Sequence, residues 1–240
     1  MEAYLDNSAT TRVDAQVQEL MKKLMDVDFG NPSSRHQKGV VAEGYIKEAR
    51  QKIAATLKVD PKELIITSGG TESNNMALIG TALAAKRKGN HIITTAVEHP
   101  SVKATASFLE EQGFRITFLS VDSRGQISLE DLKEALTPDT ILVSIMYVNN
   151  EIGTIQPVEE AAKLVHATVP GAVFHVDAIQ AYGKVMIRPK QQGIDLLSVS
   201  SHKFHGPKGA GFLYCSSKVN LHPIIFGGGQ QSGMRSGTEN

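Results

Sequence analysis

Apolar stretches typical of buried strands alternate with stretches that have helical spacing along almost the whole chain. This alternation predicts an α/β protein with a mostly parallel central sheet and helices on both faces. The predicted strands are residues 3–5, 64–67, 91–95, 115–120, 141–148, 172–176, 194–199 and 210–214. The predicted helices are residues 17–24, 37–57, 71–88, 102–112, 129–136 and 158–167.

Small polar clusters follow five of the predicted strands. They are Gly70-Thr71, His99, Asn150, residues 177–180 and residues 200–203. Ligands of open α/β sheets bind beyond the carboxyl ends of the strands. Five polar strand ends in one chain therefore indicate a single site along that edge of the sheet.

Composition narrows the class of protein. The 25 basic residues balance the 25 acidic ones, and this zero net charge argues against a nucleic-acid or membrane-surface binder. The single cysteine, Cys215, excludes an intrachain disulfide and makes a cysteine metal cluster implausible, so we expect a cytoplasmic protein without a metal. No signal peptide or membrane-spanning run is recognised, and we expect no membrane partner.

The connection over residues 200–209 carries two lysines between two apolar runs. Lys203 is either a solvated loop amine or a nucleophile that forms an imine with a carbonyl cofactor. Ser200 and His202 favour the second interpretation, because both could hold an anionic group beside it. Lys208 lies beyond the turn, and its neighbours support the role of nucleophile less well.

A strand leads into a glycine turn and then a helix at residues 68–74, with Gly70 in the turn and Thr71 close to the helix start. The free N–H groups of a helix start bind anions. No Gly-Lys-Ser/Thr follows, so this is not a nucleotide-binding Walker loop, and no G-x-G-x-x-G is present. The pattern also suits a plain helix cap.

A pyridoxal phosphate site needs a lysine, a carboxylate at the ring nitrogen, a stacking group and a phosphate cradle. Asp177 at the end of a buried strand could face the ring nitrogen, with Gln180 near the same ring and His99 stacked on it.

Each of these residues also has a structural interpretation. Asp177 could be a helix cap, His99 a loop residue, and Asn150 a turn residue. His202 and His205 could ligate a metal, but no carboxylate or cysteine lies nearby in sequence to complete the set. Spacing alone leaves these alternatives open.

The chain resembles the NifS-like cysteine desulfurases, which are class V aminotransferases with the fold-type I architecture. The matching motifs occur in family order over essentially the whole chain. They are D-N-S-A-T-T (6–11), G-N-P-S-S-R-H (30–36), S-G-G-T-E-S-N-N (68–75), E-H-P-S-V (98–102), V-N-N-E-I-G (148–153), H-V-D-A-I-Q (175–180), S-H-K-F-H-G-P-K-G (201–209) and M-R-S-G-T (234–238).

The resemblance implies a role for each candidate residue. Lys203 would form the imine with pyridoxal 5'-phosphate, and His99 would stack on the ring and transfer protons. Asp177 would pair with the ring nitrogen, and Gln180, with Asn150, would bond the phenolic oxygen. The residues implied at the phosphate are Gly70, Thr71, Ser200, His202 and, from the partner subunit of a homodimer, Thr238.

The resemblance also implies an activity, namely removal of sulfur from L-cysteine to give L-alanine and an enzyme persulfide. The sulfur would pass to an acceptor protein for iron–sulfur cluster assembly or tRNA thiolation, without direct nucleic-acid binding. Two alternatives stay open. One is a selenocysteine lyase or another class V enzyme, and the other is a non-catalytic fragment that dimerises or docks a partner.

The sequence departs from the family pattern at its carboxyl end. The family's persulfide-forming cysteine, its substrate-binding arginine and most of its small domain lie beyond the position of Asn240. We therefore expect residues 16–240 to form the cofactor-binding large domain and residues 1–15 a segment that packs with the absent small domain. We also expect these 240 residues to be inactive alone, with Cys215 an ordinary half-buried thiol.

Overall fold

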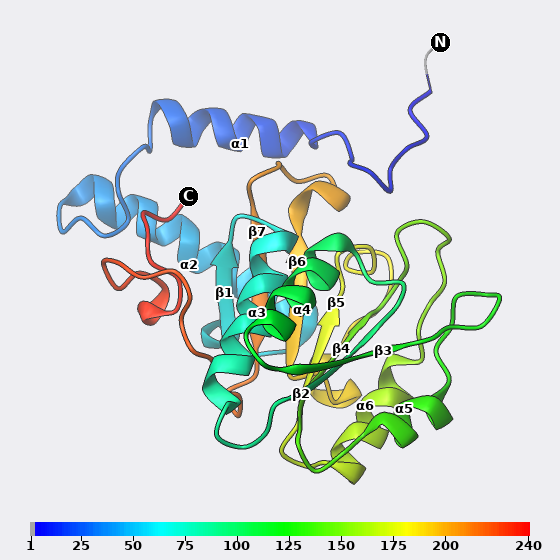
Figure 1. Ribbon diagram of the computed structural model, residues 1–240. Coiled ribbons are helices and arrows are strands. Elements are labelled where there is room, and N and C mark those ends of the chain that lie inside the picture. Colours follow the sequence, from blue (N-terminus) through cyan, green and yellow to red (C-terminus); the bar gives the residue numbers. More distant parts are fainter. Residues whose placement is uncertain (1–2) are drawn as a thin grey trace.

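The computed structural model describes residues 3–240 and contains one seven-stranded sheet (Figure 1). The strands are β1 (Leu64–Thr67), β2 (His91–Thr95), β3 (Arg115–Leu119), β4 (Thr140–Met146), β5 (Val173–Asp177), β6 (Leu196–Ser200) and β7 (Gly211–Cys215). The helices are α1 (Ala15–Asp26), α2 (Gln37–Leu57), α3 (Gly70–Ala85), α4 (Pro100–Glu111), α5 (Leu129–Ala135), α6 (Val158–Thr168) and α7 (Pro189–Gln192). The predicted α/β class is confirmed.

The strand order is β1-β7-β6-β5-β4-β2-β3. Strand β7 runs antiparallel to both of its neighbours, β1 and β6, and every other pairing is parallel. The carboxyl ends of the six parallel strands therefore meet at one edge, whereas β7 ends at the opposite edge.

Helices cover both faces because successive strand residues point to opposite sides. Ile92 and Leu142 pack with the buried face of α3, in a cluster that also includes residues of α4. Their neighbours Ile93 and Val143 pack in the other cluster, which contains residues of α2, α5 and α6. All four side chains are fully buried, so these strands form the centre of a three-layer core.

Residues 3–27 lie outside these layers. Helix α1 buries none of its residues, and Figure 1 shows it apart from the sheet. The predicted strand at residues 3–5 is wrong: Tyr4 and Leu5 are exposed, and no strand of the described chain pairs with them. An apolar run of this length forms a strand only where a neighbour supplies hydrogen bonds.

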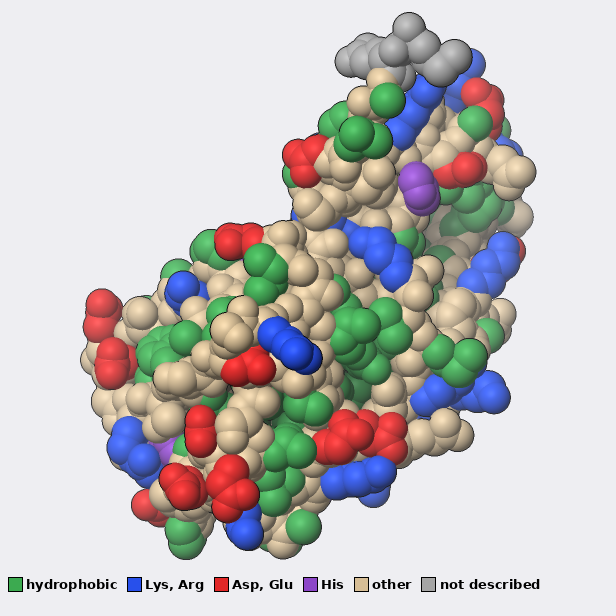
Figure 2. Space-filling model, turned by 90° about the vertical axis from the view of Figure 1, so that its right-hand side faces the viewer, with side chains coloured by type: hydrophobic (Ala, Val, Ile, Leu, Met, Phe, Trp, Pro, Cys, Tyr) green, Lys and Arg blue, Asp and Glu red, His purple; other side chains and the backbone are tan. Residues whose placement is uncertain are grey.

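The surface carries both signs of charge. Acidic and basic side chains lie intermingled on the face seen in Figure 2, with hydrophobic groups between them. Across residues 3–240, none of the helices combines the length and the apolar character that crossing a membrane requires.

Candidate active site

A cavity of about 630 Å³ opens at the carboxyl edge of the sheet, where the polar strand ends meet. It contains nine of the ten predicted site residues. These are Gly70, Thr71, His99, Asn150, Asp177, Gln180, Ser200, His202 and Lys203. The remaining residue, Thr238, is exposed and does not line this cavity.

Lys203 lies in the short helical turn that follows β6, and its Nζ donates hydrogen bonds to the carbonyl oxygens of Ser8 (2.5 Å) and Ala9 (2.7 Å). The amino-terminal segment therefore crosses the lysine loop, and a bond from the Thr11 N–H to the His202 carbonyl (2.8 Å) fixes it there. Burial and the nearby charge of Lys184 lower the pKa of Lys203. Both effects favour the neutral amine, which is the nucleophilic form.

Asp177 is the last residue of β5 and is 4% exposed. Its carboxylate accepts hydrogen bonds from the Ile179 N–H (3.0 Å) and from Asn74 Nδ2 (2.8 Å). Burial raises the pKa of Asp177 despite these donors. A buried carboxylate of this kind gains most from a cationic partner in the cavity.

The start of α3 forms the opposite wall. Its cap, Gly69, has a φ of +146°, which favours glycine, and a Cβ on Gly70 would come within 2.0 Å of Ile179 Cδ1. Gly70 therefore packs against Ile179 with no room for a side chain, and the first turn of α3 lines the cavity beside Thr71 and Ser200. An adjoining hollow of about 480 Å³ shares these groups and includes Lys208, so the helix start lies between two amines.

His99 caps the amino end of α4 and lies on the cavity wall. Its Nδ1 contacts the Ser101 N–H (3.1 Å) and the Ser101 hydroxyl (2.8 Å). Asn74 Nδ2 lies 2.9 Å from that same hydroxyl and also bonds Asp177. Asn74 and Ser101 were not assigned roles from the sequence, although both belong to motifs quoted above, S-G-G-T-E-S-N-N and E-H-P-S-V.

Gln180 and Asn150 both line the cavity. The Gln180 amide donates to the carbonyl of Ser8 (2.8 Å) and accepts from Lys184 Nζ (3.3 Å). The side chain of Gln180 is therefore held between the amino-terminal segment and a second lysine. The predicted bond of Gln180 to the phenolic oxygen of a cofactor stays a prediction.

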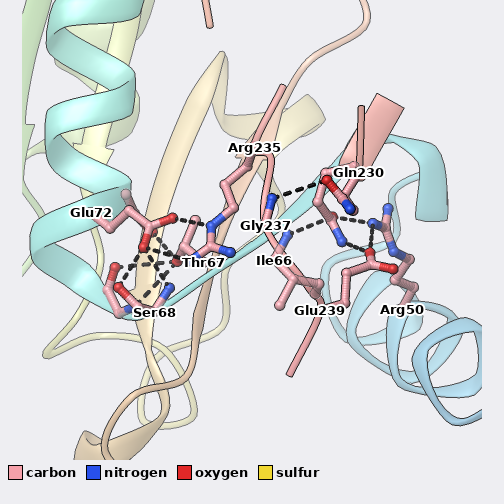
Figure 3. Close-up of polar contacts among 12 residues, drawn as sticks. Arg50, Ile66, Thr67, Ser68, Glu72, Gln230, Arg235, Gly237 and Glu239 are labelled. Carbon is pink, nitrogen blue, oxygen red and sulfur yellow. Dashed lines mark hydrogen bonds and ion pairs between the residues drawn. The ribbon is translucent and has the colours of Figure 1, made fainter. Parts of the chain in front are cut away.

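The carboxyl-terminal residues attach to the start of α3 (Figure 3). Arg235 pairs with Glu72 of the first turn of α3, at 2.7 Å from Nε and 3.3 Å from Nη2. Glu72 also accepts from the backbone N–H of Ser68 (3.0 Å). Burial opposes ionisation of Glu72, but the bonds from Arg235 and Ser68 lower its pKa overall. The ion pair thus neutralises a carboxylate next to Thr71 and anchors the segment that carries Thr238.

Replacing Arg235 with methionine is expected to destabilise the protein by about 1 kcal/mol, because the pair is only partly shielded from solvent. We also expect faster amide hydrogen exchange over residues 235–239, measured by mass spectrometry. Arg235→Lys retains the charge but loses the two-donor guanidinium group. Its stability and its exchange rates should therefore lie between those of wild type and Arg235→Met. Unchanged exchange in Arg235→Met would contradict the anchoring role.

A second buried carboxyl lies behind the cavity. Glu98 Oε1 accepts from the backbone N–H of Met146 (2.8 Å) and from the Thr95 hydroxyl (2.9 Å), and its Oε2 has no partner within residues 3–240. Burial, with the charge of Asp177 as the second cause, raises the pKa of Glu98 to about 8. Glu98 is therefore protonated in the folded protein at neutral pH.

Glu98 should make stability depend on pH. Because its folded pKa lies above the ordinary value of 4.5, its stabilising contribution is present in full below about pH 4.5 and is lost as the pH rises through about 8. Relative to Glu98→Gln, the wild type should lose about 3 kcal/mol of unfolding free energy between about pH 5 and pH 9. Denaturant titrations across this range measure the difference, and the exposed Glu111→Gln variant is the control. Parallel curves for wild type and Glu98→Gln would show that Glu98 is ionised in the fold.

Cys215 is far from the lysine. It pairs with Leu196 at the start of β6, whereas Ser200, at the end of β6, leads into the Lys203 turn. Burial, with Asp195 and Glu63 as further causes, raises the pKa of the Cys215 thiol to about 12. Cys215 is thus a half-buried, unreactive thiol at the opposite edge, as predicted.

The residues present fit pyridoxal phosphate. The cavity volume falls in the usual range for small-ligand sites, about 300–1,000 Å³. The cavity is lined by the Lys203 amine, whose pKa is lowered, and by the buried Asp177 carboxyl group. It is also lined by the start of the 16-residue helix α3. Among the described residues, no group of three or more His, Cys, Asp or Glu side chains could hold a metal ion.

Comparison with known proteins places this cavity in a family context. Residues 3–239 match the family model described as "Aminotransferase class-V". The cysteine desulfurase IscS of Dictyoglomus turgidum is 50% identical over 239 residues, which cover 100% of this chain and 60% of that protein. Other curated relatives give similar shares, so the chain spans about 60% of their length.

Two solved structures agree with the fold over nearly every residue. A structure titled "NIFS-LIKE PROTEIN" superposes with a TM-score of 0.98 at 44% identity and covers 100% of this chain and 66% of that one. A structure titled "SspA in complex with cysteine" has a TM-score of 0.95 at 41% identity, with 99% and 69% covered.

Proposed function

Because the chain belongs to the class V aminotransferase family, we propose that it holds pyridoxal phosphate at Lys203 and serves the removal of sulfur from L-cysteine, with L-alanine as the other product. The observation that carries the proposal is the meeting of Lys203, Asp177 and His99 at one cavity with the start of α3. The relatives named cysteine desulfurase and the relative structure with bound cysteine support L-cysteine as the substrate.

When bound, the cofactor would supply an electron sink for bond cleavage next to the substrate's amino carbon. Lys203 would bind it covalently, since its lowered pKa makes the neutral amine accessible. Asp177 would hold the ring nitrogen in its charged form, because a buried carboxylate favours a facing cation. The Gly70 backbone, Thr71, Ser200 and His202 would receive the phosphate, and His99 would lie against the ring and hold or move a proton there.

The acceptor of the sulfur is the part of the reaction that these 240 residues do not supply. The only cysteine, Cys215, lies at the far edge of the sheet with its thiol protonated. We therefore propose that this chain alone does not turn over L-cysteine and that a thiol outside it takes the sulfur.

Several finer features belong to the same proposal. Thr238, exposed on a segment anchored to α3, would reach the phosphate of the partner subunit in a homodimer. An acceptor protein for iron–sulfur cluster assembly or tRNA thiolation would take the sulfur. Cytoplasmic location and packing of residues 1–15 on a small domain stay predictions.

The test combines trapping with substrate challenge. Borohydride reduction of the protein with pyridoxal phosphate should leave the cofactor's mass on the peptide that contains Lys203. L-Cysteine, but not L-serine, should then change the visible absorption of unreduced protein, while alanine release stays at the rate of free cofactor. A label on another lysine would overturn the proposed site. Faster change with L-selenocysteine than with L-cysteine would favour a lyase for that amino acid, and alanine release well above free cofactor would show that the chain is active alone.

A further inference from the structure

Two buried side chains, Asn74 and Ser101, connect the groups on two sides of the cavity. They join His99 on one wall to Asp177 at its floor through three contacts of 2.8–2.9 Å. We propose that Asn74 and Ser101 are positioning residues that hold neutral His99 with its proton on Nε2 and tie this ring to the Asp177 carboxylate. That this arrangement helps to bind a cofactor rests on the function proposed above. The tautomer of His99 does not depend on that function.

The backbone fixes the tautomer first. His99 is the cap of α4, and its Nδ1 accepts the N–H of Ser101 at 3.1 Å. Pro100, the first residue of the helix, has no N–H, so the Ser101 N–H is the first donor that the cap can satisfy. A nitrogen that accepts from a peptide N–H cannot carry a proton itself. The proton of the neutral ring is therefore on Nε2.

The side chains add a second donor to the same nitrogen. Asn74 is 0% exposed, and its amide group has two hydrogens, of which one faces Asp177 Oδ2 (2.8 Å) and the other Ser101 Oγ (2.9 Å). Because the Ser101 hydroxyl accepts from Asn74, its own hydrogen is available for His99 Nδ1 at 2.8 Å.

The bond to Asp177 sets the direction of the whole chain of bonds. Asp177 Oδ2 accepts from Asn74 Nδ2, which leaves Asn74 Oδ1 without a partner in the described structure. All donors then point the same way, from Asn74 through Ser101 to His99. The Nε2–H of His99 is left to the cavity, where it can donate a hydrogen bond to a bound group.

The tautomer can be measured without cofactor. Protein labelled with ¹⁵N in its histidines would be examined by NMR above about pH 8, well above the ordinary imidazole pKa of about 6.5. The signals of His99 are assigned by their loss in His99→Gln. We expect Nδ1 to show the shift of an unprotonated nitrogen and Nε2 that of a protonated one. The opposite pattern would overturn the proposal.

The two positioning residues are tested by substitution. Ser101→Ala should move the tautomer ratio towards protonated Nδ1 by roughly 5-fold, and Ser101→Thr should restore it. Ser107→Ala, on the exposed side of the same helix, is the control. Asn74→Leu should shift the ratio similarly and weaken cofactor binding about 10-fold. Asn75→Ala, at the half-buried neighbouring position, should leave the ratio unchanged.

The outcomes separate the two proposals. An unchanged ratio in both Ser101→Ala and Asn74→Leu would overturn the positioning role, and Asn74→Ser serves if Asn74→Leu fails to fold. Wild-type protein that shows the expected tautomer but does not bind pyridoxal phosphate would refute the proposed function and leave this inference standing.

Discussion

Replacing Lys203 with alanine is expected to abolish covalent attachment of pyridoxal phosphate while leaving the fold intact. Lys203 is the amine that reaches the cavity from the end of β6, and its bonds to the carbonyls of Ser8 and Ala9 are its only hydrogen bonds within residues 3–240. Because the side chain is partly exposed, its loss should change the unfolding free energy by no more than about 1 kcal/mol. The visible absorption band of the bound cofactor, and the label trapped by borohydride, should both disappear.

Two other lysines make this result specific. Lys208→Ala removes the amine of the adjoining hollow and should retain the band, though with weaker affinity for the phosphate. Lys103→Ala alters an exposed position of α4 and should behave as wild type. A band that persists in Lys203→Ala and vanishes in Lys208→Ala would transfer the covalent role to Lys208.

Asp177→Asn is expected to separate stability from cofactor binding. Burial raises the pKa of Asp177, because an ionised carboxylate is unfavourable at this position of the fold. The neutral amide removes that cost, and rotation of the Asn74 side chain can offer its unpartnered Oδ1 to the new amide group. Unfolding at neutral pH should therefore need the same or more denaturant than wild type.

The same substitution should weaken pyridoxal phosphate binding about 100-fold, since the buried partner of the ring nitrogen is lost. Asp195→Asn is the control, because Asp195 is a half-buried carboxyl whose pKa is also raised by burial but which lies at the opposite edge of the sheet. Asp195→Asn should bind cofactor as wild type does. Equal affinity in Asp177→Asn and wild type would refute the role of Asp177.

Local sequence pattern predicted the elements well because each is specified by its own residues. The strands Leu64–Thr67 and His91–Thr95 have the predicted bounds, and most other elements differ by one or two residues. The prediction of a strand at residues 3–5 failed because a strand also needs a neighbouring strand, which the pattern of one segment does not reveal. The reversed direction of β7 was likewise outside the reach of local pattern.

The sequence allowed prediction of those site residues that lie at or just after the carboxyl ends of strands. Lys203, Asp177 and His99 were found in this way, and the fold brings them to one cavity. Asn74 and Ser101 were missed because their roles depend on contacts between α3, α4 and β5, 27 and 103 residues apart along the chain. The burial of Glu98, one residue before His99, depends equally on the packing of β2 against β4.

The position of β7 between β1 and β6 has a consequence for synthesis of the protein on the ribosome. Strand β1 leads directly into the start of α3 at the cavity, yet its only partner among the described strands is β7, about 150 residues later. Chains fold as they emerge, and a pairing between distant segments must wait for the later one. The candidate cavity can therefore assemble only after residue 215 has left the exit tunnel, so a ligand of this cavity would meet a nearly finished sheet and could not act as a template for its early strands.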